Sequence, residues 1–111
     1  MDKDMAQLIY DVLMAQMVVL MSWGFQYPRV VADGYGLQFH VNGFVFKGWV
    51  RIVYNQGNDL FDIYLLKSKD EIVAAIEGVY ISELVRVIDS HVEHCENYNE
   101  RVMQEYENMQ I

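Results

Sequence analysis

The chain has 111 residues, a length typical of one domain, and 53% of them are hydrophobic, which is too many for a disordered protein. The formal net charge is −8. The segment from Asp70 onward carries ten acidic and two basic residues, whereas six of each precede it. Such a surface disfavours direct contact with nucleic-acid phosphates, and it either keeps a small protein soluble or attracts a basic protein. We therefore expect a single domain over residues 1–111 without a direct nucleic-acid partner.

The chain carries one cysteine, Cys95, so it cannot form an intramolecular disulfide, and a reducing compartment is favoured. Asp2, Lys3 and Asp4 do not form the positively charged start of a secretory signal. The most apolar run, residues 12–23, is shorter than the roughly 20 residues that span a bilayer. These features predict a cytoplasmic protein with no membrane partner.

Apolar residues recur at helical spacing from residue 3 to about residue 22, which predicts a first helix. Gly24 is expected to end this helix at its C-terminus. Residues 24–36 contain Tyr27-Pro28 and the turn signal Asp33-Gly34, so we expect a long irregular segment there.

Residues 37–66 predict a meander of three antiparallel strands, because apolar and polar residues alternate and two turn signals interrupt the alternation. A two-residue turn at Asn42-Gly43 would pair Val41 with Phe44. A four-residue turn over 55–58 would pair Tyr54 with Asp59, Arg51 with Asp62 and Trp49 with Tyr64. Gly48 predicts a bulge or the close approach of a helix. The residues of the expected core face are Leu37, Phe39, Val41, Phe44, Phe46, Val50, Ile52, Phe61, Ile63 and Leu65.

Ser68 and Glu71 have the spacing of a capping box, which predicts a short helix to about Glu77. Gly78 would end or kink it, and a long helix would follow from about residue 81 or 82 to residue 107. The expected fold is therefore α+β, with an N-terminal helix, a three-stranded antiparallel β-meander, a short helix and a long C-terminal helix.

Two surfaces of this expected fold are candidates for association. The outward face of the meander is too apolar to be left in water, so either the chain itself or a partner must cover it. The long helix has a narrow apolar seam that fits pairing with one other helix. The predicted interaction surface consists of Val45, Trp49, Val53, Leu60, Tyr64, Leu84, Ile88, Cys95, Tyr98 and Val102.

Metal-ligand residue types occur together at His91, His94 and Cys95. A zinc or nickel site there would need two further ligands, from a second chain or from His40. We favour the interpretation without a metal, in which His91 lies on the helix seam and Cys95 is a buried thiol. The acidic surroundings of Cys95 would raise its pKa, which disfavours a nucleophile. We predict no catalytic residues, no cofactor and no metal.

These features predict a small, acidic, non-enzymatic protein-interaction module, a homodimeric adaptor or chaperone-like protein with a protein partner. The helix-then-meander order resembles that of secretion chaperones that hold an extended client, although the second pair of strands of that family is missing. The same order and charge resemble small acidic phage-encoded inhibitors that imitate nucleic acid. The alternative function is therefore a phage or mobile-element inhibitor, whose acidic C-terminal helix engages a basic, nucleic-acid-binding protein.

Overall fold

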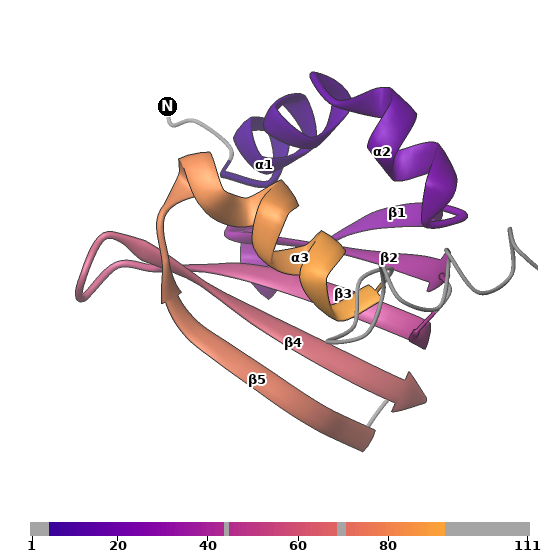
Figure 1. Ribbon diagram of the computed structural model, residues 1–111. Helices are drawn as coiled ribbons and strands as arrows, with labels where there is room; N and C mark the ends of the chain where they lie inside the picture. The colour runs from indigo at the N-terminus through magenta and orange to yellow at the C-terminus, as the bar shows by residue number, and fades with distance from the viewer. Residues whose placement is uncertain (1–4, 44, 69–70, 93–111) are drawn as a thin grey trace, which may run out of the picture.

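The computed structural model describes residues 5–43, 45–68 and 71–92. Helices α1 (Met5–Met14) and α2 (Met17–Ser22) come first, and helix α3 (Leu84–Val92) comes last. Between them, five strands form one antiparallel sheet in the order β1-β2-β3-β4-β5, and the helices lie on one face of it (Figure 1). The strands are β1 (Gln26–Val31), β2 (Gly36–Asn42), β3 (Lys47–Asn55), β4 (Leu60–Ser68) and β5 (Glu71–Val79).

The prediction of a three-stranded meander is wrong, because a further strand is added at each edge of the sheet. The segment expected to be irregular contains β1, whose Pro28 is tolerated because an edge strand does not need every backbone donor. The segment expected to form a short helix contains β5. Ile72, Val73, Ile76 and Val79 are β-branched, and pairing with the apolar strand β4 outweighs the local capping-box signal.

The expected N-terminal helix is present as two shorter helices, with Gln16 between them in a non-helical conformation. Leu13 of α1 and Leu20 of α2 are both buried against the sheet. Gly24 follows α2 with a positive φ of 68°, as expected of the residue that ends a helix. The predicted long helix begins as a 3-10 turn at Ile81–Glu83 and continues as α3. Its predicted continuation to residue 107 lies outside the described residues.

Both predicted strand registers are wrong, but each by an even number of residues. Val41 pairs with Gly48 instead of Phe44, and Arg51 pairs with Tyr64 instead of Asp62. An even shift leaves every side chain on its predicted face. The first turn differs because β2 ends at Asn42 and β3 begins only at Lys47. The N–H groups of Val45 and Phe46 both donate to the carbonyl oxygen of Val92 (2.7 and 3.2 Å). A contact with the end of α3 thus replaces the predicted tight hairpin.

Gly48 marks a close approach of a strand, not of a helix. Its φ is 156°, and a Cβ atom placed on it would lie 2.4 Å from the carbonyl oxygen of Leu66 on β4. Only glycine fits this position without a shift of one of the two strands.

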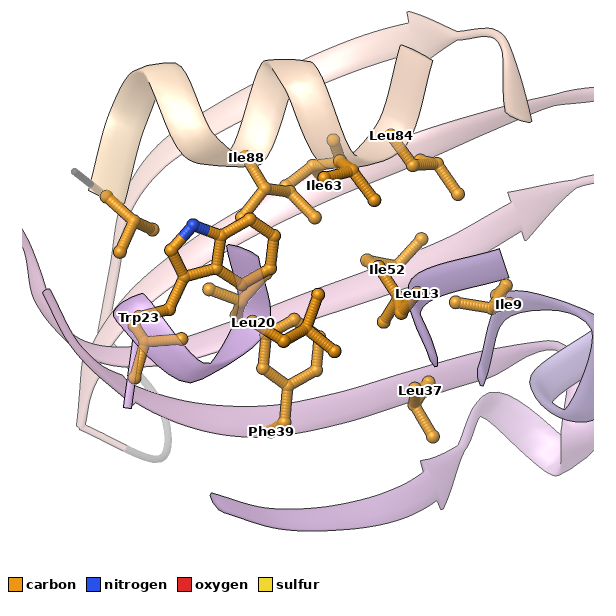
Figure 2. Close-up of a cluster of buried hydrophobic side chains, with 14 of the residues drawn as sticks. Ile9, Leu13, Leu20, Trp23, Leu37, Phe39, Ile52, Ile63, Leu84 and Ile88 are labelled. Carbon is orange, nitrogen blue, oxygen red and sulfur yellow. The ribbon is translucent and has the colours of Figure 1, made fainter. Parts of the chain in front are cut away.

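The core lies between the sheet and the three helices (Figure 2). Trp23 is fully buried there, and its indole stacks on Phe39 of β2 with ring centroids 6.4 Å apart. The indole Nε1–H donates a hydrogen bond of 2.9 Å to Oδ1 of Asp89 on α3. The carbonyl oxygen of Trp23 also accepts from the N–H of Asn42 (2.6 Å). Trp23 therefore joins the end of α2 to β2 and to α3.

Replacing Trp23 with phenylalanine is expected to lower the free energy of unfolding by about 2–3 kcal/mol. The substitution leaves the half-buried Asp89 without this donor and creates a small cavity. Urea denaturation measures the change. Val18→Ala is the control, because Val18 is 82% exposed, and it should change the value by no more than about 0.5 kcal/mol. Equal stabilities of Trp23→Phe and the wild type would contradict this role.

Candidate interaction surface

The sheet face opposite the helices, here called the outer face, is defined by the strand registers. Alternation along each strand sets its residues in three rows, of which two cross all five strands and the third crosses β1 to β4. The first row consists of Gln26, His40, Trp49, Leu66 and Ile72. The second row consists of Arg29, Gln38, Arg51, Tyr64 and Ala75. The third row consists of Val31, Gly36, Val53 and Asp62.

The first row makes one end of the outer face apolar and aromatic. Leu66 is only 1% exposed, Trp49 is half-buried, and Ile72 at the edge is 51% exposed. The imidazole of His40 packs edge-on against Trp49 with ring centroids 4.9 Å apart. The Nδ1 atom of His40 is buried, yet it has no hydrogen-bond partner among the described residues. A buried polar atom of this kind normally has a partner.

The second and third rows carry the charges of the outer face. Arg51 donates from Nε to Oε1 of Gln38 (2.9 Å), and it forms no ion pair within the described ranges. The carboxylate of Asp62 is only 8% exposed, and it accepts from the N–H of Gly78 (3.1 Å) and from Nδ2 of Asn55 (3.4 Å). The carboxylate of Asp62 thus has two hydrogen bonds within the protein, whereas the guanidinium of Arg51 has one side-chain acceptor among the described residues.

A groove of about 490 Å³ opens on the outer face. Its walls are apolar apart from Arg51 and the phenol of Tyr64. The lining residues are Val31, Ala32, Arg51, Val53, Tyr64 and Ile72.

The phenol of Tyr64 is held in its neutral form. Burial raises its pKa above the ordinary value of 10.0; the charges of Asp62 and Glu77 raise it further, and Arg51 opposes them. The influence of Glu77 links β5 electrostatically to the second row.

The structure separates the predicted interaction residues. Trp49, Val53 and Tyr64 lie together on the outer face, and Leu60 is half-buried at the start of β4. Val45 lies in the β2–β3 connection and is 46% exposed. Leu84 and Ile88 are fully buried against the sheet, so neither side chain is exposed for a contact between chains. The remaining members, Cys95, Tyr98 and Val102, lie outside the described residues.

The candidate metal ligands do not come together in the part of the chain that the structure describes. His40 lies on the outer face, whereas His91 belongs to α3 on the other side of the sheet, so the two cannot bind one ion. Nδ1 of His91 contacts the carbonyl oxygen of Val87 (2.9 Å). His94 and Cys95 are outside the described ranges. Within these ranges, no group of three His, Cys, Asp or Glu side chains has the geometry to hold a metal.

Sequence reasoning missed three residues that line the groove: Val31, Ala32 and Ile72. The first two were assigned to an irregular segment and the third to a helix. The adjacent β-branched residues Val30-Val31 and Ile72-Val73 were the available signal for strands at these positions.

Comparisons of the chain with protein-family models, with curated proteins and with solved structures found no match. None of the helices in the described ranges has the length and apolar character needed to cross a membrane.

Stability is expected to fall as the pH rises above about 10, and Tyr64→Phe should reduce that loss. Because the pKa of Tyr64 is raised in the folded state, the unfolded chain releases this proton first. The contribution is fully present below pH 10.0 and is lost as the pH rises through the higher folded-state pKa. Urea denaturation between pH 9 and pH 12 measures the effect.

The same experiment has an internal comparison, because the pKa of Tyr54 is also raised, chiefly by its hydrogen bond with Asp59. Tyr64→Phe should therefore leave part of the alkaline loss in place. If Tyr64→Phe and the wild type lose stability identically between pH 9 and pH 12, the raised pKa of Tyr64 does not contribute to the alkaline loss of stability.

Proposed function

We propose that the protein is a non-enzymatic protein-interaction module that forms a homodimer through its outer sheet face. The observation that carries this proposal is that the helices of the described chain all lie on one face of the sheet, while the opposite face keeps the half-buried Trp49, Val53 and Tyr64 and the exposed Ile72. A sheet face left in water is normally polar. Contiguous apolar surface of this kind marks association sites.

A second copy is a suitable partner because the outer face carries both signs of charge. The second row has Arg29 and Arg51, whereas Asp62 and Glu77 supply negative charge beside Tyr64. A two-fold dimer brings the same patch of each chain together, so the patch must be complementary to itself. The guanidinium of Arg51, which forms no ion pair with the described residues, can then meet a carboxylate of the other copy.

The two described groups with a clearly shifted pKa are not suited to general-base catalysis at pH 7. Tyr54 and Tyr64 are the described groups whose pKa is clearly shifted, and both values are raised. A tyrosine with a raised pKa stays neutral at pH 7 and is a poor general base. The lone cysteine fits a reducing compartment, and we propose a cytoplasmic location for the module.

Val53→Glu is expected to weaken dimerisation by at least about tenfold, because a buried central contact is worth more than about 1 kcal/mol. Val53 is half-buried in the third row and lines the groove. Val30→Glu is the matched control, since Val30 is 55% exposed and its partner Leu37 belongs to the core face. Sedimentation equilibrium measures both variants.

Circular dichroism establishes that each variant is folded before the comparison. A wild-type protein that stays monomeric at about 100 μM would contradict the proposal. Equal dimerisation of Val53→Glu and the wild type would contradict the assignment of the interface to the outer face.

A further inference from the structure

The two edge strands of the sheet differ in how well they are protected from pairing with another chain. β1 contains Pro28, which has no N–H, and Tyr27 with a positive φ of 57°. Its register with β2 shifts between Gln26 and Arg29. Proline, a basic side chain and an irregular register are the features by which edge strands resist further pairing. The β1 edge is therefore blocked.

β5 (Glu71–Val79) is less protected in its side chains, although its pairing with β4 shifts register at three points and Gly78 has a positive φ of 73°. It contains neither proline nor a basic residue. It is bonded to β4 on one side, and no described element pairs with its other side, which lies at the margin of the sheet in Figure 1. Ile72 and Val73 are 51% and 48% exposed. A long, apolar, unpaired edge strand presents a row of free backbone N–H and C=O groups to any extended chain.

We propose that β5 is a strand-addition site that binds an extended, basic segment of another protein as a sixth strand. Backbone hydrogen bonds provide affinity in this mode of binding, and alternate side chains provide specificity. Nine residues of strand offer an edge about 30 Å long. Strand addition uses the backbone groups of the β5 edge, whereas the proposed dimer uses side chains of the outer face; the two surfaces adjoin at Ile72 and Glu77.

The charge of β5 selects the chemistry of the segment. Glu71 and Glu77 are both exposed, and they stand near the two ends of the strand. Opposite charges on neighbouring strands stabilise pairing, and like charges oppose it. A segment with lysine or arginine residues therefore fits this edge, whereas an acidic segment does not.

A second copy of β5 is a poorer occupant for the same reason. Antiparallel self-pairing centred on Ala74 sets Glu71 directly opposite Glu77. Self-pairing centred on Ala75 makes the same two glutamates diagonal neighbours, which are still close enough to interact.

The test uses the full chain and a fluorescein-labelled nine-residue peptide in which lysine and valine alternate. Fluorescence anisotropy should show binding that weakens as salt is added. The same peptide with all its amide nitrogens methylated should bind at least about tenfold more weakly, because two or more hydrogen bonds are lost. A peptide with glutamate in place of lysine should not bind.

Two protein variants place the site on β5. Glu71→Lys should weaken binding of the lysine peptide by about fivefold, and Val73→Lys, a protective charge on the edge, should also weaken it. Their matched controls are Asp11→Lys on α1 and Val30→Lys on β1, both at exposed positions, which should bind the peptide like the wild type.

Three outcomes would overturn the proposal. The first is no binding of the lysine peptide at about 1 mM. The second is that the methylated and unmethylated lysine peptides bind with equal affinity, or that the β5 variants bind the lysine peptide as tightly as their controls do. The third is a wild-type dimer that Val73→Lys converts to a monomer, because the edge would then be occupied by a second copy.

Discussion

The two-sided apolar character of the sheet is the constraint on which the rest of this structure depends. Phe39, Ile52 and Ile63 alternate with Trp49, Tyr64 and Leu66, so both faces have apolar side chains to bury. The helices cover one of these faces. Trp23, at the end of α2, stacks on Phe39 of the sheet and donates a hydrogen bond to Asp89 of α3, so it links the two helices. The described helices all lie on that face, so they leave the half-buried Trp49, Val53 and Tyr64 of the outer face to the partner that we propose.

Much of the central sheet was predictable from the sequence. Alternation in β2, β3 and β4 identified the correct core face, because the register errors were even and did not exchange the faces. Which residues pair between β2 and β3, and between β3 and β4, was not predictable from local turn preference. Asn42-Gly43 favours a tight hairpin, but the N–H groups of Val45 and Phe46 are engaged by the distant carbonyl of Val92.

The edge strands were mispredicted for a different reason: local patterns there fit two structures equally well. Ser68 and Glu71 have capping-box spacing, yet the β-branched residues that follow extend a sheet whose strand β4 needed a neighbour. The spacing of Leu84 and Ile88 suits a helix pair as well as a helix on a sheet, and burial in the core shows the second. On the candidate surface, alternation identified Trp49, Val53 and Tyr64, whereas the groove residue Ile72 required the true pairing of β5.

Acrylamide quenching of tryptophan fluorescence, followed as the protein is diluted, tests the central claim most directly. The chain has two tryptophans: Trp23 is fully buried in the core, and Trp49 is half-buried on the outer face. Dimerisation through the outer face predicts that Trp49 becomes more quenchable as the dimer dissociates, while Trp23 stays protected. Quenching that is high and independent of protein concentration from nanomolar to about 100 μM would show that the outer face is never covered by a second copy.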